Sequence, residues 1–172
     1  ENEDGGCFDP EQTKDVPSEA CVAANRDTLY QVNAVKWQLD SQGNVVSSES
    51  LGDFITAHEG DDRLHSSAAY AVNNSDVVVG ISAGWPITDV TPDKDMSFYF
   101  TRNYAFIHKG EELIDITDRD EYIGSALVDI NYNNIAVGYF RKLVNGSERN
   151  KFAYVDTSSD DLTPILPQDY FL

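Results

Sequence analysis

The sequence has few basic residues, few thiols and no long apolar run. Among its 172 residues, Lys and Arg number 12 against 30 Asp and Glu, so the net charge is -18 and the isoelectric point is near 4.2. Such a surface repels phosphate backbones and anionic lipid head groups, so we expect neither nucleic acid nor a membrane surface as a partner. Cations, basic proteins and uncharged glycans stay open as partners. The simpler interpretation is that the acidity serves solubility.

No apolar run approaches the roughly 18 residues that a transmembrane helix requires. The longest is Val77–Ile81, which Asp76 precedes. We therefore expect no membrane insertion. No signal peptide is recognisable, and the chain begins with Glu1 rather than Met. These features favour a processed product or an excised piece of a longer chain.

The two cysteines, Cys7 and Cys21, both lie near the start, on either side of a segment that contains Pro10 and Pro17. A disulfide across this short loop would constrain an otherwise mobile terminus, with a stabilisation of roughly 3 kcal/mol. It would also imply an oxidising compartment, which means an extracellular or periplasmic location. Two free buried thiols are the alternative. No CxxC pair or Cys/His cluster indicates zinc.

The clearest positive feature is an internal repeat. Ser67–Gly80 and Ser125–Gly138 lie 58 residues apart and are identical at five of fourteen aligned positions, including Asn73 and Asn131. In both segments an apolar stretch leads into an Asn-rich turn and then a β-branched run. This pattern predicts a β-hairpin. The unbroken run Val77–Val79 predicts a strand that is buried on both faces.

A second pattern of strand, polar turn and strand follows each hairpin. Its first strand has a central alanine, and we align Ala105 with Ala153. An earlier copy is centred on Ala34, and a weak match at Glu19–Gln31 indicates a decayed first hairpin. The expected strand pairs are Tyr104–Ile107 with Leu113–Ile116, Phe152–Val155 with Leu162–Ile165, and Asn33–Trp37 with Leu51–Gly52.

These patterns predict an all-β fold. We expect an irregular segment at 1–18, one β-repeat domain at 19–166 and a tail at 167–172. The domain contains units near 19–52, 66–117 and 124–166, each with up to about four short antiparallel strands, which is the blade pattern of a β-propeller. A β-sandwich is the alternative. Propellers close with about four to eight blades, so three units predict a partial or open array. We expect such an array to associate with itself or with the rest of a longer chain. Alternatively, the N-terminal segment covers its edges.

The repeated residues resemble the HAF repeat of bacterial proteins. That family pairs an Ala-x-x-Ile-Asn hairpin ending in Val-Val-Gly with an Ala-Phe strand and a Gly-x-x-x-Asp-Leu strand. The family usually has Gly at the hairpin turn, where this sequence has Asp76 and Asn134. The resemblance implies an extracellular or periplasmic protein of uncharacterised function, and it supplies no catalytic residues. The segments that match are Ala69–Gly80, Ala126–Gly138, Ala105-Phe106 and Leu113–Ile116.

No catalytic motif is recognisable around the three histidines, His58, His65 and His108, which we interpret as structural or exposed. Acidic loops could supply oxygen ligands to calcium, the one cofactor that we consider. The segment containing Asp156, Asp160 and Asp161 is the candidate calcium site, with solvated turn residues as the alternative.

Aromatic residues on the expected strands are interpreted as core. These are Trp37, Phe98, Tyr99, Phe100, Phe106, Phe140 and Phe152. Trp85 is different, because it lies beside Pro86 in a polar insertion. We predict that it contacts a sugar or a protein partner.

The sequence leaves three classes of function open. The first is a non-catalytic binding or scaffold module of an exported protein, with a protein or glycan partner. The second is a carboxylate-dependent hydrolase, for example one that acts on glycans through acidic loop residues. The third is a structural role, in which the chain completes a larger repeat array.

Overall fold

The computed structural model describes residues 7, 16–22, 31–54, 65–84 and 102–167. Within these residues the chain forms nine β-strands and one short helix at 18–22. The strands make three antiparallel sheets, so the predicted all-β class is confirmed. In the described part of the chain, no helix has the length and apolar character needed to cross a membrane.

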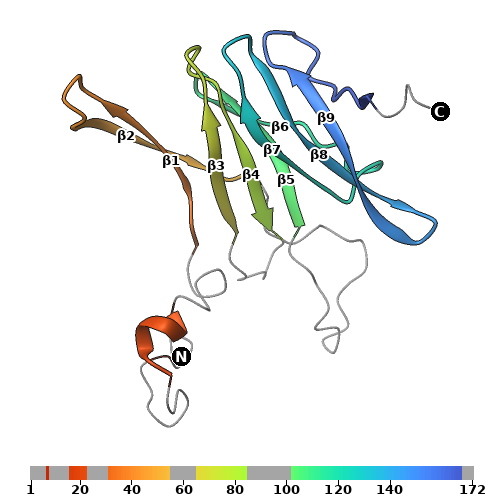
Figure 1. The fold of residues 1–172 in the computed structure, drawn as a ribbon, viewed down its shortest axis with the longest axis horizontal. Coiled ribbons are helices and arrows are strands. Elements are labelled where there is room, and N and C mark those ends of the chain that lie inside the picture. Colours follow the sequence, from red (N-terminus) through yellow and green to blue (C-terminus); the bar gives the residue numbers. More distant parts are fainter. Residues whose placement is uncertain (1–6, 8–15, 23–30, 55–64, 85–101, 168–172) are drawn as a thin grey trace.

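Each sheet is built from strands that follow one another along the chain. Figure 1 shows the sheets in succession, from the β1–β2 hairpin at the left to β9 at the right. Sheet A pairs β1 (Ala34–Leu39) with β2 (Val45–Gly52). Sheet B has the order β3 (Ser66–Val72), β4 (Val78–Gly84), β5 (Arg102–Lys109) and β6 (Glu112–Asp115). Sheet C has the order β7 (Gly124–Ile130), β8 (Ile135–Val144) and β9 (Ser147–Asp156).

Two expected elements differ from the structure. Residues 18–22 are helical where a decayed hairpin was predicted at Glu19–Gln31, and 23–30 lie outside the described residues. The strand expected at Leu162–Ile165 is reduced to a single bridge between Tyr154 and Ile165. Pro164 explains this, because proline lacks the backbone N–H that a longer ladder needs.

The β3–β4 and β7–β8 hairpins turn in the same way. The side-chain oxygen of Asn73 accepts hydrogen bonds from the backbone N–H of Ser75 at 3.0 Å and of Val77 at 3.1 Å. Asn131 makes the equivalent bonds at 2.9 and 3.0 Å. Each turn also has a residue in the left-handed region, Asp76 at φ 59° and Asn134 at φ 64°. Asp and Asn tolerate this conformation, and Asn bonds readily to its own main chain, so these residue types specify the turn.

The hairpins also have a β-bulge at the same place. One register shift lies at Tyr70, between Ala69 and Ala71, and the other at Val128, between Leu127 and Asp129. Gly80 and Gly138 lie opposite these bulges. A Cβ atom there would lie 2.0 Å from the carbonyl oxygen of Ala68 or 1.9 Å from that of Ala126. Both positions therefore require glycine.

Sheet B lies between the other two sheets. Val77, Val79 and Ile107 pack in a core shared with sheet C, whereas Val78 and Phe106 pack in a core shared with sheet A. The predicted burial of Val77–Val79 on both faces is therefore confirmed. Apolar burial between sheets is the main source of stability in such a stack.

The aromatic core prediction holds only in part. Phe106 and Phe140 are fully buried. Trp37 and Phe152 are exposed, because they lie on the outward faces of the two end sheets. Residues 98–100 lie outside the described residues.

The alignment of Ala105 with Ala153 is wrong by one residue. Phe106 pairs with Gly80 and Ala153 pairs with Gly138, so Ala153 is the counterpart of Phe106. A shift of one residue moves a strand's side chains to the opposite face. Val79 and Ile107 therefore have Val137 and Tyr154 as counterparts.

Two buried serines show which strands of sheet B correspond to the strands of sheet A. Ser67 Oγ accepts a hydrogen bond from the N–H of Ala34 at 2.9 Å, and Ser125 Oγ accepts one from Ala105 at 2.7 Å. Because Ser67 and Ser125 are counterparts, β1 corresponds to β5 and β2 corresponds to β6. Within the described residues, sheet A has no counterparts of β3 and β4.

Candidate functional site

The residues predicted for calcium are held in turns by their own loop. The carboxylate of Asp156 accepts hydrogen bonds from Ser158, and that of Asp161 accepts one from the N–H of Thr163 at 2.9 Å. These bonds lower the pKa of both carboxyl groups. In the part of the chain that the structure describes, no group of three or more His, Cys, Asp and Glu could hold a metal ion. The calcium site stays a prediction. Asp160 lies in the same loop.

A groove of about 430 Å³ beside this loop gathers five carboxyl groups. They belong to Asp115, Asp118, Glu121, Asp160 and Asp161. Two of them form ion pairs, Asp115 with Arg119 at 2.6 Å and Glu121 with Lys142 at 3.1 Å. A general acid needs a raised pKa, whereas the pKa of Asp161 is lowered by its hydrogen bonds to Thr163.

The other predicted site residues are two cysteines, a tryptophan and the histidines. Cys7 and Cys21 form the predicted disulfide, with their Cα atoms 5.5 Å apart. Trp85 lies outside the described residues, as does His58. His65 and His108 are both buried.

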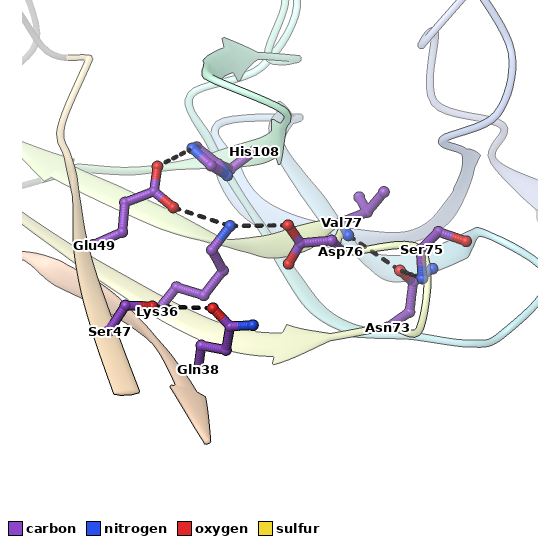
Figure 2. Close-up of polar contacts among 9 residues, drawn as sticks. All are labelled: Lys36, Gln38, Ser47, Glu49, Asn73, Ser75, Asp76, Val77 and His108. Atoms are coloured by element: carbon purple, nitrogen blue, oxygen red, sulfur yellow. Dashed lines mark hydrogen bonds and ion pairs between the residues drawn. The ribbon is translucent and has the colours of Figure 1, made fainter. Parts of the chain in front are cut away.

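A network of charged groups joins sheets A and B (Figure 2). Lys36 Nζ lies 3.0 Å from a carboxylate oxygen of Glu49 and 3.1 Å from one of Asp76. The other carboxylate oxygen of Glu49 lies 3.6 Å from Nε2 of His108. Hydrogen bonds to Glu49 and then to Asp76 raise the pKa of Lys36. His108 is only 3% exposed, and its Nδ1 makes no hydrogen bond with any described residue.

The same positions are apolar at the junction between sheets B and C. Lys36 pairs with Glu49 across sheet A as Ile107 pairs with Ile114 across sheet B. Since β1 corresponds to β5, Lys36 is the counterpart of Ile107. The A–B junction therefore has a charged network where the B–C junction has two isoleucines. The sequence does not give the register that pairs Lys36 with Glu49 across sheet A.

The outward face of sheet C is apolar. Val137, Tyr139, Phe152 and Tyr154 line a shallow groove of about 370 Å³ there. Their counterparts in sheet B face sheet C and are buried. Val79, for example, is 0% exposed whereas Val137 is 42% exposed, and Phe152 is 75% exposed. We define Val137, Tyr139, Phe152 and Tyr154 as the end face of sheet C.

Comparison with known proteins identifies the family. The model of a family described as "Protein of unknown function (DUF3466)" matches residues 2–172. No curated protein and no solved structure matches the chain.

The resemblance to the HAF-repeat family is wrong, because the matching family is a different one and nothing found indicates HAF repeats. The residues that supported it, such as Asn73 and Gly80, are those that an Asn turn and a bulged hairpin require in any protein. The chain belongs to the DUF3466 family of proteins of unknown function.

Proposed function

We propose that this chain is a non-catalytic binding and scaffold module of an exported protein. In this proposal the sheets are copies of one repeated unit, arranged as propeller-like blades. Each blade stacks on the next through an apolar face. The end face of sheet C is the surface that binds a protein partner.

One observation supports this most directly. Val137 and Phe152 lie in sheet C where Val79 and Ala105 lie in sheet B, and the sheet B residues are completely buried against sheet C. The end face thus repeats a surface that already binds a sheet within this chain. Contiguous exposed apolar surface of this kind is typical of protein interaction sites.

The disulfide between Cys7 and Cys21 supports export. Disulfides persist in extracellular and periplasmic compartments and are rare where thiols are kept reduced. We therefore place the module outside the cytosol. Peptide mapping of the native protein without reductant should recover the two cysteines in one linked fragment, whereas recovery of two free thiols would contradict this location.

A dye that binds exposed apolar surface, such as ANS, tests the end face. Phe152→Ser should lower ANS fluorescence, because it replaces an apolar side chain that is 75% exposed on the end face. Tyr132→Ser is the matched control, since Tyr132 is 77% exposed but lies in the β7–β8 turn. Equal ANS signals from the wild type and Phe152→Ser would contradict the proposal.

The carboxylate-dependent hydrolase is the second candidate. The groove of five carboxyl groups favours it, while the lowered pKa of Asp161 counts against a general acid there. Hydrolysis of a glycan panel by the wild type, lost in Asp160→Asn and Asp161→Asn, would establish it. Trp85 stays a predicted sugar or partner contact, and loss of glycan binding in Trp85→Ala would support that role.

A further inference from the structure

Among the residues that the structure describes, one edge of β1 has no partner strand, and we call it the open edge. In sheet B, β5 pairs with β4 on one side and β6 on the other, whereas in the described residues β1 pairs only with β2. The carbonyl of Ala105 points to β6, where it accepts a hydrogen bond from Ile116. The carbonyl group of its counterpart, Ala34, therefore points to β2. The backbone N–H and C=O groups of successive residues point to opposite sides of a strand. Those of Val35 and Trp37 therefore point to the open edge.

The burial of two equivalent residues shows what this edge lacks. Val72 and Ile130 occupy the same position in the two repeated hairpins. Ile130 is 7% exposed because it packs against residues of sheet B that include Val77 and Val79, whereas Val72 is 57% exposed. The difference arises because sheet A has no inner strand pair among the described residues.

A hollow of about 270 Å³ lies beside the open edge, between β1 and β3. Its lining is mainly apolar and includes Val35, Trp37 and Leu39 of β1, and Ala69, Ala71 and Val72 of β3. An open strand edge next to an apolar groove is the geometry of strand addition. In that mode, backbone hydrogen bonds give affinity and side-chain pockets give specificity.

Charge does not block this edge. A lysine often protects an edge strand from pairing, but Lys36 is held by Glu49 and Asp76 on the face toward sheet B.

We propose that the open edge of β1 binds a β-hairpin of the same type as β3–β4, supplied by a partner polypeptide, which completes sheet A as a four-stranded blade. This inference rests on the proposed function, because it treats the sheets as copies of one unit. The bound hairpin has an Asn turn and a glycine in its second strand. That glycine pairs with Val35, as Gly80 pairs with Phe106 in sheet B.

The chain's own β7–β8 hairpin provides a probe. A synthetic peptide of residues 124–141 is titrated into the 172-residue protein. Since the protein has two tryptophans, Trp85→Phe leaves Trp37 as the single tryptophan, whose emission is excited selectively at wavelengths that tyrosine does not absorb, and Trp37 lines the hollow. We expect a saturable blue shift of Trp37 emission as the peptide covers it. A second peptide with Gly124→Cys and Arg141→Cys, residues that pair in the native hairpin, is closed by a disulfide so that peptide folding does not limit binding.

Matched variants locate the contact. Val35→Pro removes an N–H at the open edge, whereas Val35→Thr retains it. We expect Val35→Thr to bind the peptide like the wild type and Val35→Pro to bind at least about tenfold more weakly, the effect of losing one to two hydrogen bonds. A Gly138→Val peptide, whose side chain would collide with the Ala126 carbonyl, should not bind.

The outcomes separate this inference from the proposed function. No shift with the closed peptide, or equal shifts with Val35→Pro and Val35→Thr, would overturn the hairpin site. If Phe152→Ser still lowers ANS fluorescence, the proposed function stands even without a hairpin site on β1. We also expect sedimentation of the protein alone to show a monomer. A dimer that the peptide does not dissociate would overturn the inference, because the occupant would then be a second copy.

Discussion

The hydroxyl oxygen of Ser125 accepts a hydrogen bond from the backbone N–H of Ala105 at 2.7 Å, across the junction between sheets B and C. Ser67 and Ala34 make the same contact between sheets A and B. Both serines are buried. Each junction therefore combines apolar packing with a buried hydrogen bond from a strand N–H to a serine hydroxyl.

Ser125→Ala should destabilise the protein by about 1–3 kcal/mol, because it leaves the buried N–H of Ala105 without an acceptor. Urea unfolding followed by circular dichroism would measure this. Ser75→Ala, at an exposed turn position, should change stability by less than about 0.5 kcal/mol. If both variants unfold at the same urea concentration as the wild type, the junction hydrogen bond contributes nothing.

Gly138→Ala should be destabilising, since the new Cβ would meet the Ala126 carbonyl oxygen at 1.9 Å. Overpacking of this kind costs about 1–3 kcal/mol or more. Gly124→Ala is the comparison, because the nearest atom would lie 3.2 Å away and the neighbouring backbone need shift only slightly. Thermal unfolding should rank the variants as wild type, Gly124→Ala and Gly138→Ala in falling order of melting temperature.

The charged network should be replaceable by the apolar pair found at the next junction. Lys36→Ile alone or Glu49→Ile alone should each lose about 0.2–1 kcal/mol, as expected for partly exposed ion pairs. The double variant should regain this loss, because it reproduces the Ile107–Ile114 pair. A double-mutant cycle measures the coupling. If the losses simply add, the two side chains do not act together.

The same lysine predicts that part of the stability of the fold is lost at alkaline pH. The pKa of Lys36 is raised in the folded protein, so its contribution to stability is complete below the unfolded pKa of about 10.4 and is lost as the pH rises through the higher folded value. Melting temperatures of the wild type and Lys36→Ile should therefore converge above about pH 10.4. A constant difference up to pH 12 or so would contradict this.

Two carboxyl groups predict how the stability of the fold decreases at acid pH. Hydrogen bonds to Asn44 lower the pKa of Asp40, and Arg102 lowers that of Glu148. Their contributions are present above the unfolded values of about 4 and are lost as the pH falls through the folded ones. Calorimetry should show a falling melting temperature below about pH 4, with a shallower fall in Asp40→Asn. Glu111→Gln, in the turn after β5, is the control and should follow the wild type.

The hairpins could be predicted from sequence because their signals are local. An Asn at the turn, a glycine opposite the bulge and a β-branched run are read within fifteen or so residues. The positions of Asn73, Asn131, Gly80 and Gly138 were therefore recognisable without a structure.

Register between strands could not be predicted in the same way. Ala105 and Ala153 look equivalent in sequence, yet pairing with Gly80 and Gly138 makes Phe106 the true counterpart of Ala153. The predicted burial of Trp37 and Phe152 is also wrong, because their strands resemble core strands in sequence although both side chains are exposed. These two side chains are exposed because their sheets lie at the two ends of the stack of three sheets. The arrangement of the sheets cannot be recognised within a single strand.

The consecutive pairing of strands has a consequence for folding. Each ladder between the described strands joins strands that follow one another along the chain. Each sheet can therefore form from contacts between consecutive strands, which favours rapid formation. Cooperativity then depends on the two junctions. Counting only the residues that the structure describes, the A–B junction buries fewer apolar side chains than the B–C junction. In hydrogen exchange, the amides of β1 and β2 should open first as a local unit while β7, β8 and β9 stay protected, so the molecule would melt from its N-terminal sheet inward.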